Sequence, residues 1–378
     1  MRYTKIIALL LVFALSASMM AGCGDLDTLK RQYQEKHPFM KAFETLEPET
    51  VMVTVGTAAV TWQQLFHWIF FNTTQFEAQN GDITDWNQML ETGKTVAEHI
   101  LSISLSNCLE YAYVEAASEA MGLEVNAAMQ EAAKDQMLSD AAAYGDYDTF
   151  VDAIEAEYST EEYYLYTKLM SAMYSAIYYE LYGAEGEFLT EGEILEHAAD
   201  DDYMMAKQIR IYLYDMNTAE LFDEEKRAEC LNHCEWIIEQ LNACETVEEM
   251  EARFTELMLE NAQDASAELF PDGYLFQAAD LHPELAAAVQ ELEEYEYSDI
   301  IFADESYAIL LRLPINVDVV PLSYAQYIDY GYNYTLRYLT SVEMYDETVI
   351  GWTTDFPAVF SPEYEALDLA ELLADGKK

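Results

Sequence analysis

Positive charge is scarce in this sequence: 18 lysine and arginine residues stand against 71 aspartate and glutamate residues, a formal net charge of −53 at pH 7. Each phosphate contact in a nucleic-acid complex requires a lysine or an arginine, and anionic lipid headgroups repel an acidic surface. The charge therefore excludes nucleic acid as a partner.

Disordered acidic chains contain few aromatic residues, and this sequence does not share that composition. Hydrophobic residues make up 52% of it, with 29 tyrosines, 16 phenylalanines and 5 tryptophans. This much apolar surface predicts a folded protein, and 378 residues are enough for two or more domains.

Common catalytic and cofactor motifs are missing. No glycine-rich phosphate loop, His-Glu-x-x-His helix or Gly-x-Ser-x-Gly elbow occurs, so hydrolase and nucleotide-binding functions receive no support. Cys230, His233 and Cys234 fall on one helix face, and Cys244 could add a fourth zinc ligand. Metal-binding cysteines normally come in tight-turn pairs, so we interpret this stretch as plain helix and expect no metal and no cofactor.

One other polar feature has an ordinary explanation. Asp200, Asp201 and Asp202 lack the alternating ligands of a calcium loop, which favours a solvated linker.

The sequence has only five cysteines. Apart from Cys23 they are Cys108, Cys230, Cys234 and Cys244, which could pair in any of three ways or stay reduced.

Long apolar runs are absent, and the N-terminal one is too short to span a bilayer. It covers residues 6–15, follows Arg2 and Lys5, and leads to Met-Ala-Gly-Cys ending at Cys23. This pattern predicts a lipoprotein signal peptide over residues 1–22, a lipid-modified (palmitate-bearing) Cys23, and a chain held on the extracytoplasmic face of the cell membrane. An ordinary signal peptide cut nearby is the alternative.

The first half of the mature chain is predicted to be mostly helical. After a tether at residues 23–49, alternating valines over 51–55 predict a strand, and Thr61 with Gln64 forms a capping box that begins a helix. A long helix is expected over residues 85–121. Further capping boxes are expected at Ser159 with Glu162 and at Thr190 with Glu193.

A second domain is predicted after residue 202, where alternating apolar residues over 207–214 indicate a half-buried strand. Helices are expected at residues 218–241, 247–260 and 284–292, and further strands at 274–276, 300–302 and 307–313. This order makes a compact α+β domain. The last helix is expected over residues 362–374.

Several segments then carry a family resemblance. They are VMVTVGTAAVTWQQL at 51–65, GLEV at 122–125, TEGEI at 190–194, AKQI at 206–209, the stretch from Phe254 to Asp264, PDGYLF at 271–276 and YAIL at 307–310. In this order, behind a lipoprotein signal, they resemble the parvulin-type (PpiC) peptidyl-prolyl isomerase lipoproteins of the PrsA and SurA kind.

The resemblance implies a helical chaperone lobe at residues 50–202, a parvulin-like domain at 203–314 inserted after it, and a C-terminal segment at 315–378 that packs on the lobe. It implies a membrane-anchored foldase that binds unfolded or proline-containing secreted polypeptides. Active members carry two histidines facing an acid, but this sequence has Gln208 and Ala308 there, with Asp264 as the acid. We therefore expect a degenerate site with weak or absent isomerase activity.

Candidate binding residues follow from the same comparison. Phe276 is expected as a pocket wall, with Leu275 and Ile309 as weaker candidates; core packing is the alternative for Phe276, and a solvated helix end for Asp264. Tyr174, Tyr178 and Tyr182 line one helix face and would suit unfolded chains, unless they pack between helices.

Two other functions stay open. One is a surface lipoprotein that binds a specific peptide or carbohydrate without folding activity. The other is an active isomerase in which other groups replace the missing histidines.

Overall fold

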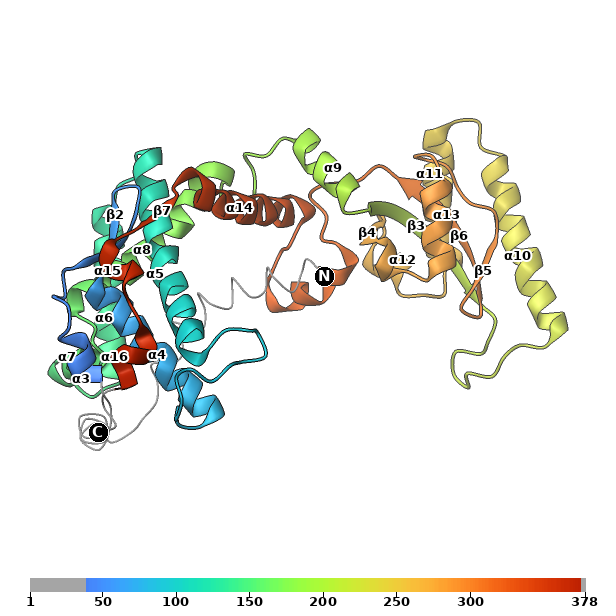
Figure 1. Ribbon diagram of the computed structural model, residues 1–378. Coiled ribbons are helices and arrows are strands. Elements are labelled where there is room, and N and C mark those ends of the chain that lie inside the picture. Colours follow the sequence, from blue (N-terminus) through green and yellow to red (C-terminus); the bar gives the residue numbers. More distant parts are fainter. Residues whose placement is uncertain (1–38, 375–378) are drawn as a thin grey trace. The chain divides into compact units, whose positions relative to one another are not determined.

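A computed structural model describes residues 39–374, which form two compact units (Figure 1). Unit 1 contains the described residues up to Leu181 and those from Tyr345 onward, and unit 2 contains Tyr182–Met344. The sequence predicts domain boundaries elsewhere, between residues 202 and 203 and between residues 314 and 315. The predicted signal peptide and Cys23 lie outside the described residues. Among the helices of residues 39–374, none combines the length and the hydropathy needed to cross a bilayer.

The chain is a mixed α+β protein, as expected, and it contains two small antiparallel sheets. Unit 1 holds the sheet β2-β1-β7, built from β1 (Val51–Val55), β2 (Ala58–Thr61) and β7 (Ala358–Phe360). Its helices are α3 (Phe39–Phe43), α4 (Trp62–Asn80), α5 (Val96–Met121), α6 (Ala127–Ala142), α7 (Tyr147–Ala156), most of α8 (Glu161–Tyr182), the end of α14 (Leu336–Asp355), α15 (Pro362–Glu365) and α16 (Leu369–Ala374).

Local sequence signals explain several of these boundaries. Thr61 accepts a hydrogen bond from the Gln64 amide while the Gln64 side chain accepts one from the Thr61 amide, which is the predicted capping box. The C-terminal strand β7 pairs with β1, Val53 opposite Phe360, so residues from both ends of the described chain share one sheet.

Three expected helices differ from the structure. Helix α5 starts at Val96 because Gly93, with φ of 79°, and a bridge between Met89 and Thr95 reverse the chain before it. Helix α8 is capped one residue late, by Thr160, whose hydroxyl accepts from the Tyr163 amide at 3.0 Å. The expected helix at residues 362–374 is interrupted between α15 and α16.

Unit 2 contains the four-stranded sheet β4-β3-β6-β5. Its strands are β3 (Tyr203–Tyr212), β4 (Tyr274–Gln277), β5 (Ile301–Ala303) and β6 (Ser306–Leu313). Its helices are α9 (Glu191–Asp200), α10 (Glu224–Asn242), α11 (Val247–Asn261), α12 (Ser266–Leu269), η1 (Ala278–Asp280), α13 (Pro283–Glu291), η2 (Leu322–Tyr330) and the start of α14. The capping box at Thr190 and Glu193 begins α9 as predicted.

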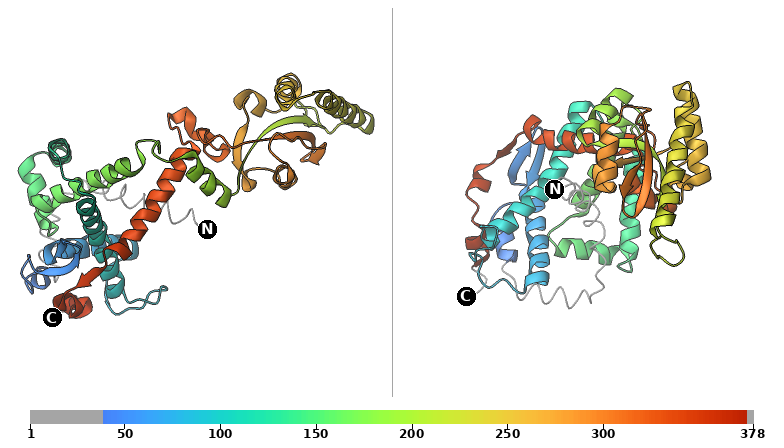
Figure 2. Two further views of the ribbon diagram at one scale, coloured as in Figure 1. Left: turned by 90° about the horizontal axis from the view of Figure 1, so that it is seen from above. Right: turned by 90° about the vertical axis from the view of Figure 1, so that its right-hand side faces the viewer.

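Helices cover both faces of this sheet, with α10 and α11 on one face and α13 on the other (Figures 1 and 2). On the first face the buried Lys207 ammonium lies 3.3 Å from Glu251 and 2.9 Å from Thr255, both on α11. On the second face Phe276, Ala308 and Leu310 form a core with Leu285 of α13. Alternation along β3 therefore assigns odd-numbered residues to α11 and even-numbered residues to α13.

Candidate functional site

Gln208 lies on β3, between β4 and β6, on the face covered by α13. Its register partner is Leu310, and Ala308 pairs with the next residue on that face, Arg210. The positions that resemble the two histidines of the family therefore share one face of the sheet.

The Gln208 side chain is buried and uses both ends of its amide. Its Nε2 donates a hydrogen bond to Asp264 Oδ2 at 2.9 Å, and its Oε1 accepts one from the Tyr274 hydroxyl at 3.3 Å. Asp264 follows the end of α11 in a loop held against β3, because the Gln263 amide donates to the Arg210 carbonyl oxygen at 2.9 Å. These three side chains, Gln208, Asp264 and Tyr274, are called the polar relay below.

Burial, and secondarily the negative charge of Asp264, raises the pKa of the Tyr274 hydroxyl well above its usual range. Tyr274 therefore remains a hydrogen-bond donor at any physiological pH. The relay can orient a carbonyl or amide group at its edge, and an amide and a phenol of high pKa are poorly suited to general-base work.

A pocket of about 370 Å³ opens beside the polar relay. Besides the relay it is lined by the apolar side chains of Leu281, Leu285 and Leu322 and by the polar side chains of Arg210, Asp280, His282 and Asp304. Its volume falls in the range of small-ligand sites. Three leucines form an apolar wall, and polar side chains, three of them aspartates, line the rest of the pocket. This acidic lining suits a neutral peptide segment better than an anionic metabolite.

Arg210 is held in place at one side of this pocket. Its Nη2 lies 2.8 Å from Asp304, its Nε donates to Ser306 Oγ at 2.8 Å, and its guanidinium lies 5.2 Å from the centre of the Tyr212 ring. The arginine charge is thus already paired, so an anionic ligand would have to compete with Asp304 for it.

The structure does not bring every predicted wall residue to the pocket. Phe276 shares the face of Gln208 but is 0% exposed inside the core of that face. Leu275 and Ile309 are also fully buried, and the register directs them to the opposite face, toward α11. They are therefore not pocket walls in this structure, because residues of one strand alternate between the two faces.

The apolar walls that sequence reasoning missed are Leu281, Leu285 and Leu322. Tyr274 was also missed, although it lies two residues before Phe276 and a two-residue period puts both on one face. Leu322 carried no local signal, because only folding brings η2 to β4.

Ala308 has no space beside it for a larger side chain. It is 0% exposed and packs in the core with Ala303, Leu310 and Leu285. The position of the second histidine is therefore closed by close packing as well as by the change of residue type.

The tyrosine stripe on α8 is mostly packed. The ring centre of Tyr174 lies 4.8 Å from that of Tyr345, that of Tyr178 lies 5.4 Å from it, and the Tyr345 hydroxyl donates to the Tyr174 carbonyl oxygen at 2.6 Å. Tyr182 is buried. This packing is the alternative that the sequence left open.

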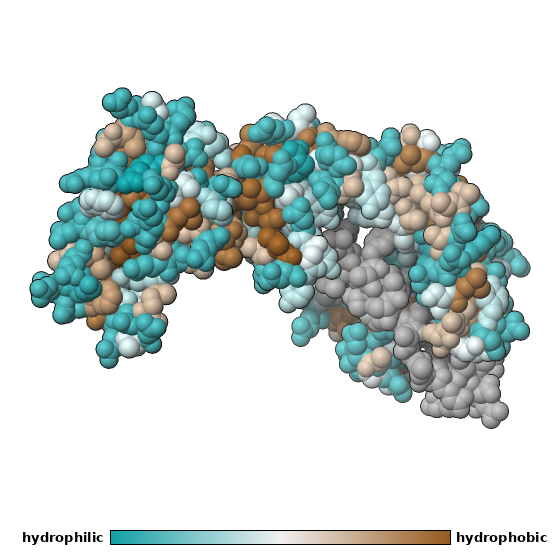
Figure 3. Space-filling model, turned by 180° about the vertical axis from the view of Figure 1, so that it is seen from behind, coloured by the Kyte–Doolittle hydropathy of each residue, from teal (hydrophilic) through white to brown (hydrophobic). Residues whose placement is uncertain are grey.

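A second group of tyrosines lies in unit 2, directly after Leu322. We call residues 322–334 the tyrosine segment; the Tyr334 ring contacts those of Tyr324, Tyr327 and Tyr332, with centres 5.4–5.8 Å apart. Tyr330 is 78% exposed. On the face drawn in Figure 3, hydrophilic residues cover most of the surface, and hydrophobic residues are exposed between them.

Comparisons with known proteins find no matching family model and no matching curated protein. Among solved structures, the foldase protein PrsA of Streptococcus pneumoniae is 15% identical over 74% of this chain and 97% of its own, with a TM-score of 0.22. PrsA of Bacillus cereus is 14% identical over 88% and 100%, with a TM-score of 0.30. A SurA-like chaperone of Campylobacter jejuni is 15% identical over 71% and 95%, with a TM-score of 0.23.

Proposed function

We propose that this chain is an extracytoplasmic foldase that binds unfolded secreted polypeptides and takes a proline-containing stretch into the pocket of unit 2. The observation that carries the proposal is the polar relay beside the leucine wall in a pocket of about 370 Å³. Leu281 and Leu285 offer the apolar contact that a proline ring needs, and Asp280, His282 and Asp304 add polar groups beside it.

The same site favours binding over turnover. Peptide rotation has a barrier of about 18–20 kcal/mol, lower at proline, and a catalyst must bind the twisted amide better than either planar form. Gln208 already uses its amide on Asp264 and Tyr274, and Ala308 offers only a methyl group. We therefore expect weak or absent isomerase activity.

The tyrosine segment is the proposed continuation of the binding surface. It starts at Leu322, which also lines the pocket, so a polypeptide held there can extend across exposed rings. Tyrosine rings bind varied sequences because each has an apolar body and a polar edge. Unit 1 is the proposed chaperone lobe, and a lipid on Cys23 the proposed anchor to the outer face of the membrane.

An aggregation assay tests the chaperone function. The mature chain should suppress the aggregation of several unrelated unfolded proteins, and the triple variant Tyr327→Ser, Tyr330→Ser, Tyr332→Ser should lose most of that effect. The control is Tyr179→Ser, which removes a tyrosine ring that is 54% exposed on α8. Failure of the wild-type chain to suppress aggregation, together with tight binding of one specific peptide or carbohydrate, would replace the foldase by the surface-lipoprotein alternative.

A protease-coupled assay on a proline peptide tests the expectation of weak or absent isomerase activity. Without catalysis the cis and trans forms exchange over about tens to hundreds of seconds, and we expect this chain to shorten that time little. A rate like that of an efficient isomerase would contradict the degenerate site while leaving peptide binding intact.

A further inference from the structure

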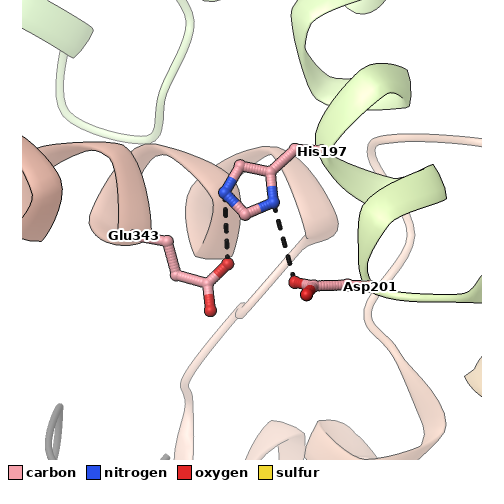
Figure 4. A group of neighbouring side chains, drawn as sticks. All are labelled: His197, Asp201 and Glu343. Atoms are coloured by element: carbon pink, nitrogen blue, oxygen red, sulfur yellow. Dashed lines mark ion pairs between the residues drawn. The ribbon is translucent and has the colours of Figure 1, made fainter. Parts of the chain in front are cut away.

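Unit 2 contains a second polar group, formed by an imidazole and two carboxylates on helices α9 and α14 (Figure 4). His197 Nδ1 lies 3.6 Å from Asp201 Oδ2, one turn later at the end of α9, and His197 Nε2 lies 3.4 Å from Glu343 Oε2 on α14. The sequence had suggested a solvated linker at Asp201. Folding instead brings it to the imidazole.

The two helices are held together independently of these side chains. Arg337 of α14 donates to the Leu189 carbonyl oxygen at 3.0 Å and forms an ion pair of 2.7 Å with Asp318. A Cβ atom at Gly186 would lie 2.8 Å from the Arg337 carbonyl oxygen, so the chain before α9 packs against the backbone of α14. The polar group is therefore assembled on a rigid support.

One ligand atom from each of the three residues can be chosen so that all lie within 4.8 Å of one another. A tetrahedral zinc ion with ligands at 2.0–2.2 Å separates them by about 3.3–3.6 Å. The His197 to Glu343 distance of 3.4 Å already meets this requirement. The side chains are 23–27% exposed, so small rotations can close the other pairs and water can complete the coordination.

We propose that His197, Asp201 and Glu343 bind a divalent first-row transition metal ion, with Zn²⁺ as the matching probe. Imidazole suits zinc, copper, nickel and iron, and carboxylates add the charge that a divalent cation needs. The bound ion would connect α9 to α14, which are distant in sequence, and would stabilise unit 2 by mass action. This role is separate from peptide binding in the pocket.

The alternative is a simple ion-pair bridge. The two carboxylates face different ring nitrogens (Figure 4), so a protonated imidazole could join them without a metal. A metal ion on Nε2 requires that nitrogen to be deprotonated and the Asp201 carboxylate to turn toward it. Direct binding measurements distinguish the two.

The experiment titrates Zn²⁺ into the untagged, chelator-stripped mature chain and follows it by calorimetry and by thermal unfolding. We expect one site per chain and a higher melting temperature with the metal. His197→Gln and Glu343→Gln should each weaken Zn²⁺ binding by at least about 100-fold. The loss of a residue that only hydrogen-bonds to a metal ligand already weakens metal binding by about 10–100-fold, and these two residues would be ligands themselves. The control is His99→Gln, which removes an imidazole of α5 that lies outside the pocket and outside this polar group.

Equal Zn²⁺ binding by the wild type and by His197→Gln would overturn the proposal. Co²⁺ provides a second readout, because a thiolate ligand adds a charge-transfer absorption that oxygen and nitrogen ligands lack. The site is supported if the wild-type chain gives a Co²⁺ spectrum without the thiolate band and the His197→Gln variant gives no bound-Co²⁺ spectrum. A thiolate band that persists in His197→Gln would move the metal to Cys230 and Cys234 and contradict the assignment. Circular dichroism of the metal-free variants verifies that they fold.

Discussion

The side-chain amide of Gln208 donates a hydrogen bond to Asp264 over 2.9 Å although the two residues are 56 positions apart. Gln208 belongs to a central strand, and Asp264 to the loop after α11. Tyr274 completes the relay from the neighbouring strand β4. The pocket thus depends on three segments that only the folded sheet brings together.

The relay should contribute to the stability of unit 2. Gln208→Ala removes both of its hydrogen bonds and leaves the buried Tyr274 hydroxyl without this acceptor, so the free energy of unfolding should fall by about 1–3 kcal/mol. Tyr274→Phe removes one hydrogen bond and should cost about 0.5–1.5 kcal/mol. Urea unfolding measures both. If Gln208→Ala proves no more costly than Tyr274→Phe, the amide does not have the central role assigned to it.

The closed space at Ala308 leads to a prediction about placing a histidine there, at the position that resembles the second histidine of the parvulin-type proteins. Ala308→His inserts a ring into a packed core and should lower the free energy of unfolding by at least about 1–3 kcal/mol, without raising isomerase activity. Phe302→His is the control, since Phe302 is 55% exposed on β5. A stable, active Ala308→His variant in thermal unfolding and peptide assays would show that the core can open.

Unit 1 should lose stability as the pH rises from about 4.5 to about 7. Burial raises the pKa of Glu110 from its ordinary value of 4.5 to about 7, and burial does the same for Glu157. Each folded carboxyl therefore holds its proton more tightly than the unfolded one, so the stabilisation is full below pH 4.5 and is lost as the pH rises through 7. Burial lowers the pKa of His67, and the stabilisation that this gives is present above pH 6.5 and lost in acid.

The variant Glu110→Gln isolates one of these groups. Because it cannot ionise, it should be more stable than the wild type at pH 8 by about 1–3 kcal/mol, with little difference at pH 4. Denaturant unfolding at several pH values measures this, with Glu131→Gln, at an exposed position of α6, as control. A pH-independent difference between Glu110→Gln and the wild type would contradict the assignment.

The N-terminal signal leads to a prediction about location. Cys23→Ser should remove the proposed lipid-attachment site, so the chain should leave the membrane fraction and lose metabolic labelling with a fatty acid. Cys108→Ser retains Cys23 and should keep both properties. Labelling that persists in Cys23→Ser would place the lipid elsewhere.

The local elements of this protein were largely determined by the sequence itself. Capping boxes at Thr61 and Thr190, and alternation along β3, act over a few neighbouring residues, where backbone hydrogen bonds and side-chain periodicity decide the conformation. The α+β class follows from such patterns, whereas the common face of Gln208 and position 308 depends on the register between β3 and β6.

Only the tertiary structure decided which residues meet. Alternation assigns Leu275 and Ile309 to a face but does not say which face has the pocket, and no local pattern predicts that Leu322 reaches it. In the same way, Glu343 meets His197 through the packing of α14 on the chain before α9. Contacts between distant segments depend on how whole faces are buried, and this is settled by the complete set of packed side chains.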